Sequence, residues 1–171
     1  MVRFGIGSNG NEAPRSNLSP TEGITEAKSA SEEPTETNPP LSFTLKLSYD
    51  HPYLKERGIE PELAQEFGVG FCRRGMMKNR IAIPIHNADG DLVAYAGRWV
   101  SRDLPEGEEK YKLPPGFKKS IVLYNLHRVK GKEPLFVVEG FISIVRLHKL
   151  GIDAIALMGR SLSQEQEKLL Q

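Results

Sequence analysis

The sequence contains a single cysteine, Cys72, and no long hydrophobic run. One cysteine excludes an intramolecular disulfide framework and is typical of a reducing compartment. No apolar stretch approaches the roughly 18–20 residues of a transmembrane helix, and the first residues lack the apolar core of a secretory signal. The four histidines show no zinc-ligand spacing with one another or with the cysteine. These absences predict a cytoplasmic protein without a zinc site or a membrane partner.

Large apolar side chains are also scarce at the start of the chain. Residues 8–40 are rich in Ser, Thr, Asn, Glu and Pro. Such a segment cannot bury enough apolar surface to offset the entropy lost on ordering. We therefore expect residues 1–40 to form a disordered linker or tail, and ordered structure to begin near Leu41.

Charge is unevenly distributed, although the formal net charge of the whole chain is only +1. Residues 71–132 contain 13 Lys and Arg residues against 6 Asp and Glu residues. A basic segment of this kind can attract phosphate groups. It is more often simply a solvated surface, so the charge count alone leaves both interpretations open.

Short strands and helices are predicted over the first ordered part of the chain. The alternation in residues 41–47 is typical of an edge strand. Two short helices should follow, because each candidate segment has a proline in its first turn and a glycine after its last. These segments run from Pro52 to Gly58 and from Pro61 to Gly68.

A β-hairpin is predicted next. Two β-rich runs flank the turn Asn87–Asp91, which contains the turn pair Asp-Gly. Pro84 should mark a strand edge or a bulge, since proline lacks the N–H that a sheet ladder needs. Residues 101–120 have no apolar periodicity and should form a loop.

The last third of the chain has a different pattern, in which predicted strands and helices alternate. An apolar strand at residues 135–139 precedes a helical pattern that ends at Gly151, and a second apolar strand follows at residues 153–158. Ser163 and Gln166 have the spacing of a capping box and predict a final helix. A strand, a helix, a strand and a helix in this order predict a parallel α/β sheet.

One residue in this part needs a specific explanation. The strand at residues 135–139 looks fully buried, yet it ends on Glu139. Sites in parallel α/β sheets form beyond the carboxyl ends of strands. A carboxylate there can hold a divalent cation, accept a proton from an attacking hydroxyl, or cap the following helix, while Gly140 permits close backbone approach. The pattern alone favours the capping role.

Five motifs in register resemble a known family. FVVEGFISIVRLHKLGIDAIALMGRSLSQEQ, at residues 136–166, resembles the opening of a Toprim domain, which occurs in bacterial-type primases, topoisomerases and some nucleases. Upstream, YLKERGI…FGVGF, RIAIPIHNADGDLVAYAGRWV and EKYKLPPGFKKSIVLYNL follow in the order of a bacterial-type primase catalytic core. The resemblance covers residues 41–171. It implies an α+β N-terminal subdomain with an antiparallel hairpin, followed by an incomplete, Toprim-like parallel α/β sheet.

The resemblance also implies an activity and a set of site residues. The family synthesises RNA primers on single-stranded DNA from nucleoside triphosphates by metal-dependent nucleotidyl transfer, and a replicative helicase is a further partner that the resemblance suggests. By position, Glu139 matches the catalytic glutamate that binds Mg²⁺ or Mn²⁺. Lys110, Lys119 and Arg57 match basic residues that contact nucleotide or template. Arg98 matches the Gly-Arg strand of the family.

The sequence departs from the family pattern in three places. Ser143 stands where primase-like Toprim domains usually have an aspartate, and Arg160 stands where they have a small residue. The Asp-x-Asp metal motif that should follow does not occur before Gln171. One carboxylate cannot replace a cluster of them around two Mg²⁺ ions. We therefore expect a truncated primase core that does not synthesise primers by itself.

Two further functions remain open at this point. The chain can be a non-catalytic module that binds single-stranded nucleic acid through its basic face. It can also be another Toprim enzyme, such as a nuclease or a topoisomerase, although that hypothesis does not explain the KYKLPPG block at residues 110–116.

The expected organisation has three parts. Residues 1–40 form the tail, residues 41–132 the basic, nucleic-acid-binding subdomain, and residues 133–171 the start of a Toprim domain. Because the last part has only two recognisable strands, its sheet should leave an apolar edge open and should favour self-association.

Overall fold

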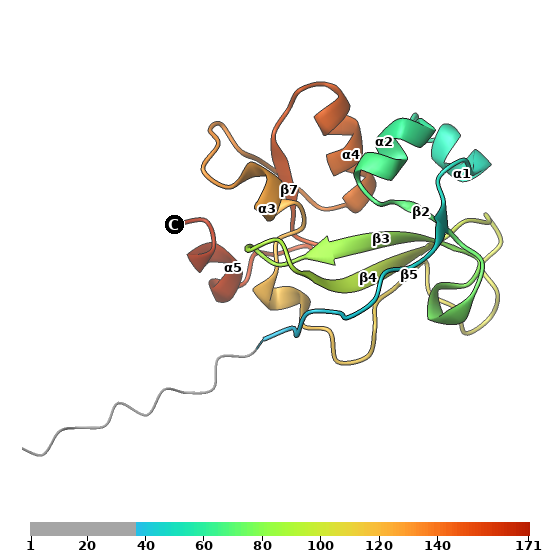
Figure 1. Cartoon of the computed structure of the whole chain (residues 1–171). Helices are drawn as coiled ribbons and strands as arrows, with labels where there is room; N and C mark the ends of the chain where they lie inside the picture. Colours follow the sequence, from blue (N-terminus) through green and yellow to red (C-terminus); the bar gives the residue numbers. More distant parts are fainter. Residues whose placement is uncertain (1–36) are drawn as a thin grey trace, which may run out of the picture. The chain divides into compact units, whose positions relative to one another are not determined.

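The computed structural model describes residues 37–171 (Figure 1). Most of the expected tail, residues 1–36, lies outside the described residues. The remaining part of it contacts the fold earlier than expected, because the side chain of Asn38 exchanges two hydrogen bonds of 2.9 Å with the backbone of Lys118. Ordered contacts therefore begin slightly before Leu41.

The first sheet is an antiparallel meander. Its strands pair in chain order, and they are β1 (Leu47–Ser48), β2 (Gly70–Cys72), β3 (Arg80–His86), β4 (Leu92–Trp99) and β5 (Tyr111–Lys112). The predicted hairpin is therefore present as β3 and β4, within a larger sheet. Residues 101–120 are not entirely a loop, since they contain β5 and the start of a 3₁₀ turn, η2 (Lys119–Ile121).

Local signals explain the hairpin. The Asn87 side chain accepts hydrogen bonds from the backbone N–H groups of Asp89 and Asp91, at 3.1 and 2.8 Å, and so closes the turn. Pro84 pairs with Tyr95 of β4. It lies beyond Ala82, which is the last β3 residue that pairs with β2, and it is close to a register shift in the ladder between β3 and β4. A proline at the irregular end of a ladder is what the sequence predicted.

Helices α1 (Pro52–Lys55) and α2 (Pro61–Glu66) also form as expected. Each begins at its proline, and the glycines that follow them, Gly58 and Gly68, have φ of +71° and +63°. Glycine reaches this left-handed region without the steric cost that a Cβ atom imposes.

The C-terminal part contains a second sheet of two parallel strands, β6 (Phe136–Val138) and β7 (Ala154–Ala156). Between them lies α4 (Phe141–Lys149), and α5 (Gln164–Lys168) follows with the predicted capping box. The remaining short elements are α3 (Leu126–Val129) and the 3₁₀ turn η1 (Gly75–Met77). An antiparallel sheet followed by a small parallel sheet confirms the predicted fold class.

The prediction that the strand before Glu139 is fully buried was wrong. Phe136 and Val137 remain 52% and 51% exposed. β6 pairs with β7 alone among the described strands, so its other edge has no neighbour. A continuous apolar run predicts burial only where both sides of a strand are covered.

The largest hydrophobic cluster draws on both sheets. Leu54 of α1, Ile83 of β3, Ile144 of α4 and Ala156 of β7 all belong to it, each no more than 1% exposed. The core therefore includes residues from both sides of the expected domain boundary between residues 132 and 133. This boundary stays a prediction.

Within residues 37–171, every helix is too short or too polar to cross a bilayer.

Candidate nucleic-acid interface

Three of the four predicted basic residues line one cavity. Arg57 lies in the turn after α1, Arg98 on β4 and Lys110 immediately before β5. They surround a cavity of about 430 Å³ together with Tyr53 and Trp99, and we call it the first basic pocket. The sheet register explains part of this convergence, because Arg98 pairs with the first residue of β5.

Aromatic rings hold the two arginines of the first basic pocket. The Arg98 guanidinium carbon lies 5.0 Å from the ring centre of Tyr111 and 5.7 Å from that of Tyr53, and the Arg57 carbon lies 4.9 Å from the Tyr53 ring. Cation–π contacts of this kind orient a guanidinium without neutralising its charge. Both arginines therefore keep their positive charge for an anion.

One tyrosine lines this pocket, Tyr53, and a second, Tyr111, contacts its residue Arg98. The Tyr53 hydroxyl is buried and has no hydrogen-bond partner among the described residues. Burial raises the pKa of the Tyr111 phenol, and the neighbouring Arg98 opposes this rise. The Tyr111 phenol is therefore protonated near neutral pH and can donate a hydrogen bond.

Glu139 follows β6 directly and is exposed. The capping role that the sequence pattern favoured was wrong: the N-cap residue of α4 is Gly140, and no side chain caps this helix. No atom of the described residues lies within 4 Å of where a Gly140 Cβ would be, so the space beside Gly140 is open. The Glu139 carboxylate makes no hydrogen bond or ion pair with the described residues and is free for another partner.

Aromatic contacts connect the start of α4 to the first basic pocket. The ring centre of Phe141, two residues after Glu139, lies 5.8 Å from that of Tyr111 and 4.8 Å from that of Tyr124. Tyr111 in turn contacts Arg98. The Glu139-Gly140 segment is therefore linked to the basic pocket by two successive side-chain contacts.

The described residues do not by themselves fit a divalent cation. No group of three or more His, Cys, Asp or Glu side chains comes together within residues 37–171. Ser143, on the first turn of α4, offers a hydroxyl where the resembled family has a carboxylate. Since Mg²⁺ needs several oxygen ligands in near-octahedral geometry, Glu139 alone supplies one ligand and not a site.

Lys119 lies apart from the other three basic residues. It lines a smaller cavity of about 170 Å³ with Gly159, Arg160 and Ser161, beyond the carboxyl end of β7. The buried Gln166 amide of α5 donates to the Lys119 carbonyl at 3.1 Å and to the Val122 carbonyl at 2.8 Å. The 3₁₀ turn that carries Lys119 is thereby attached to the capped final helix.

A structural arginine was missed in the sequence. Arg80 counted as one charge of the basic segment, but it is 1% exposed. Its guanidinium donates to the carbonyls of Gly97 and Glu109 at 3.0 and 2.8 Å, contacts the Glu108 carboxylate at 2.5 Å and lies over the Trp99 ring. Arg80 therefore anchors the loop before Lys110 instead of facing solvent. No local signal distinguishes it from its exposed neighbours.

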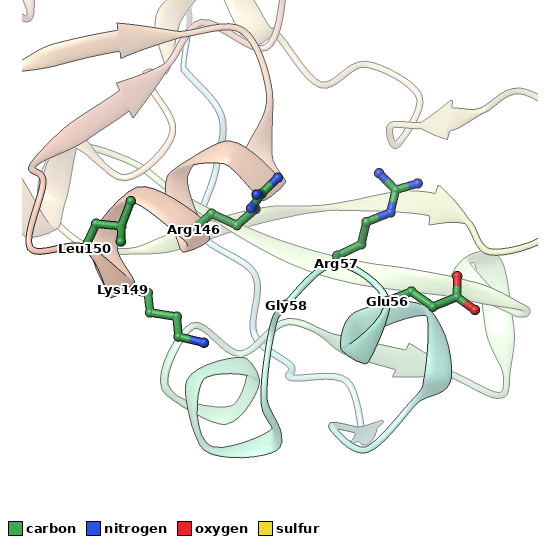
Figure 2. A pocket seen from close by; sticks show the side chains of 6 residues that line it. All are labelled: Glu56, Arg57, Gly58, Arg146, Lys149 and Leu150. Carbon is green, nitrogen blue, oxygen red and sulfur yellow. The ribbon is translucent and has the colours of Figure 1, made fainter.

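A second cavity adjoins the first. It measures about 420 Å³ and is lined by Glu56, Arg57, Arg146 and Lys149, among others (Figure 2). We call it the second basic pocket, and it shares Glu56 and Arg57 with the first. From the sequence, Arg146 and Lys149 were interpreted only as favourable charges in the last turn of a helix.

The chain is similar to known proteins over part of its length. Residues 73–130 match the family described as DNA primase catalytic core, N-terminal domain. The chain is 38% identical over 104 residues to a DNA primase of Geobacillus stearothermophilus, and the match covers 56% of this chain and 17% of that protein. The chain thus spans less than a fifth of the length of this relative.

Solved structures show the same fold. The Aquifex aeolicus primase, comprising its zinc-binding and RNA polymerase domains, is 26% identical with a TM-score of 0.60, over 69% of this chain and 38% of that chain. A DnaG primase catalytic domain bound to single-stranded DNA is 24% identical with a TM-score of 0.61, over 72% of this chain and 52% of that chain. The chain is therefore similar, in sequence and in fold, to part of the catalytic core of bacterial-type DNA primases.

Proposed function

We propose that this chain is part of a bacterial-type DNA primase, which synthesises short RNA primers on single-stranded DNA by metal-dependent nucleotidyl transfer. The observation that carries the proposal is the convergence of Arg57, Arg98 and Lys110 on one cavity. These residues come from three separate segments, and each matches a basic position of the family. A neighbour of the same fold was solved with single-stranded DNA bound.

The chemistry of the first basic pocket suits a phosphodiester strand. Arginine offers a planar fork of donors that matches two phosphate oxygens, and lysine adds a mobile point charge. Tyr111 is 36% exposed beside Arg98, so a base can stack on its ring while its phosphate meets the guanidinium. Phosphate contacts position a strand without selecting its sequence.

The remaining roles belong to the same proposal. Lys119, in its separate pocket, contacts nucleoside triphosphate. Glu139 contributes one ligand to a Mg²⁺ or Mn²⁺ site that further carboxylates complete, and kinship with primases is consistent with such metal dependence. A replicative helicase is a further partner, and a cytoplasmic location follows from the replication role of the relatives. The primase relationship supports this function over a non-catalytic binding module or another Toprim enzyme.

Binding to single-stranded DNA tests the template surface. Fluorescence anisotropy with a labelled oligonucleotide should show affinity that falls steeply between about 50 and about 200 mM salt, because binding to phosphates releases counterions. The double variant Arg98→Gln/Lys110→Gln should bind more weakly. Its salt slope, the slope of the logarithm of the affinity against the logarithm of the salt concentration, should be shallower by about one for each phosphate that no longer meets a cation.

A matched control removes the same charge elsewhere. Lys130→Gln/Lys168→Gln changes two exposed lysines outside both basic pockets and should leave the slope close to that of the wild type. An equal decrease in both double variants, or an unchanged slope in the first, would remove Arg98 and Lys110 from the interface.

Primer synthesis tests the catalytic part. Because the described residues contain no complete metal site, we expect this polypeptide alone to make no primers with Mg²⁺, nucleoside triphosphates and single-stranded template. Gel analysis of the products decides the point. Clear primer bands that disappear in Glu139→Gln would contradict this expectation and would establish a complete active site within the chain.

A further inference from the structure

The second basic pocket lies between two elements that are far apart in the sequence. Arg57 comes from the turn after α1, and Arg146 and Lys149 come from the last turn of α4. Figure 2 shows the α4 side chains projecting on the side of the helix that faces the turn carrying Arg57. These three cations and one carboxylate, Glu56, are its only charged lining residues among the described part of the chain.

Two acidic side chains outside the pocket lining, Glu66 and Asp50, already have partners. The Glu66 carboxylate of α2 forms an ion pair with Arg128 at 3.4 Å and lies 3.1 Å from the His148 Nε2 atom. Asp50 is engaged by Lys55 at 2.7 Å. Neither Arg146 nor Lys149 has an acidic partner among the described residues. Among the described residues, three cations and one carboxylate line the pocket, so it keeps an excess of positive charge.

Stabilisation of the helix does not account for this pocket. Cations in a last turn interact favourably with the helix dipole wherever they point, and such interactions contribute about 0.3–1 kcal/mol each. The dipole thus explains why basic residues occur at the end of α4. It does not explain why Arg146 and Lys149 both line a cavity that already contains Arg57. A concave surface with converging cations raises the local concentration of anions.

Arg57 makes the two basic pockets continuous. It lines the second pocket with Arg146 and Lys149, and the first with Arg98 and Lys110. Its guanidinium rests on the Tyr53 ring, at 4.9 Å, which leaves its charge available to both cavities. Glu56 also lines both cavities, so a polyanion that continues from the first pocket into the second passes one shared cation and one shared carboxylate.

We infer that Arg146 and Lys149 of α4 form a further phosphate-binding subsite, which receives the backbone of a single-stranded nucleic acid as it leaves the first basic pocket over Arg57. This inference rests on the proposed function and deepens it by giving the strand a direction across the molecule. The subsite recognises phosphate groups and not bases, since only cations, one carboxylate, a glycine and Leu150 line it.

The subsite should contribute only when the strand is long enough to occupy both pockets. We compare oligonucleotides of about 6 and about 20 nucleotides, a range that spans the site sizes of similar grooves. In Arg146→Gln/Lys149→Gln, the longer strand should bind about 5- to 20-fold more weakly at low salt, with a salt slope reduced by about one to two. The affinity for the shorter strand should fall by no more than about 2-fold.

Three controls isolate this effect from a change in helix stability. Arg146→Lys/Lys149→Arg retains the charges and should restore most of the affinity. Lys130→Gln/Lys168→Gln removes the same charge outside the pocket and should bind both strands as the wild type does. Circular dichroism and thermal melting should show that the Gln variant remains folded.

The nature of the ligand is tested with a free nucleotide. Binding of ATP should be unchanged in Arg146→Gln/Lys149→Gln. A decrease in ATP affinity as large as that for the long strand would indicate a nucleotide site and would overturn the strand assignment. An equal decrease for short and long strands would also overturn it.

The proposed function can fail separately. If Arg98→Gln/Lys110→Gln weakens binding while Arg146→Gln/Lys149→Gln does not, the template surface stands and the subsite is wrong. If the wild type binds neither strand in a salt-dependent way, both are wrong.

Discussion

At the scale of single residues, Gly97 shows how closely the chain approaches itself beside the candidate interface. A Cβ atom at this position would lie 2.5 Å from the Met77 Sδ atom and 2.8 Å from the Arg80 Cδ atom. Both distances are far below van der Waals contact, and Arg80 is itself buried. The glycine of the Gly-Arg pair is therefore required for packing, while the arginine that follows it lines the first basic pocket.

Gly97→Ala should lower the free energy of unfolding by about 1–3 kcal/mol, as overpacking does in other cores. Urea denaturation measures the change. Gly140→Ala is the matched control, because Gly140 has φ of −120° and a Cβ atom added there would meet nothing within 4 Å. The control should be close to neutral, and a larger cost for Gly140→Ala than for Gly97→Ala would contradict the packing explanation.

Two histidines pack against each other at the same scale. The ring centres of His86 and His127 lie 4.6 Å apart, and the His127 Nδ1 atom is buried without a partner among the described residues. Burial, followed by the charges of His86 and Arg128, lowers the pKa of His127 to about 4. Burial and Arg128 also lower the pKa of His86.

These pKa values predict a decrease of stability in mild acid. Between about pH 6.5 and about pH 4, the unfolded chain binds a proton at His127 that the folded chain does not bind. The free energy of unfolding should therefore fall as the pH decreases through this range. Thermal melts from about pH 7.5 to about pH 5 should show a falling Tm, and His127→Phe should flatten this dependence. An identical pH profile in the variant would exclude the histidine pair as its cause.

At the scale of elements, Arg80 determines where the loop between β4 and β5 lies. The loop folds back so that Glu108 and Glu109 meet a guanidinium buried under Trp99. The Trp99 indole also donates to the Asp103 carbonyl at 2.9 Å. Lys110 follows this anchored loop directly. Arg80 lines neither basic pocket, yet it positions Lys110, which lines the first one.

Arg80→Met should remove these hydrogen bonds while keeping most of the side-chain volume. We expect a decrease in unfolding free energy on the order of 2–4 kcal/mol, because Glu108 loses its partner and two carbonyls lose a donor. Hydrogen exchange over residues 101–110 should accelerate more than exchange in β3. Glu108→Gln should have a smaller effect, since the Glu108 side chain is 40% exposed. Equal acceleration in both segments would indicate general destabilisation instead.

At the scale of the whole molecule, the described residues share one main hydrophobic cluster, yet they leave an apolar strand open. Phe136 and Val137 of β6 are each about half exposed, and Leu135 and Val137 also line a cavity with Leu169 and Leu170. Exposed apolar strands with a free edge favour pairing with another chain. The expectation of an open edge, which followed from having only two recognisable strands, agrees with this arrangement.

Sedimentation measurements should therefore detect reversible, concentration-dependent association of the wild type. Phe136→Ser/Val137→Thr should shift the protein towards the monomer, because it removes apolar surface without introducing a charge near Glu139. Arg146→Gln/Lys149→Gln, which changes no residue that lines this cavity, should associate as the wild type does. A wild type that remains monomeric at all concentrations would contradict this prediction.

Local signals predicted most of the elements. These signals are the prolines and glycines around α1 and α2, the Asp-Gly turn and the Ser163–Gln166 capping box. Each depends on interactions between residues a few positions apart, so it can be recognised without knowledge of the tertiary structure. Errors arose where the outcome depended on distant neighbours. The burial of β6 depends on what covers it, and β5 forms because β4 offers a partner. Glu139 does not cap α4, since Gly140 occupies the N-cap position.

The candidate interface divides in the same way. The sequence by itself determined the family motifs, the basic character of residues 71–132 and the identity of Arg57, Arg98, Lys110 and Lys119 as candidates. Only the tertiary structure decided that three of these share a cavity, and that Lys119 lies in another. It also placed Arg146 and Lys149 in one cavity with Arg57. Helix and strand periods specify which face a side chain occupies, whereas packing of remote segments decides which faces meet.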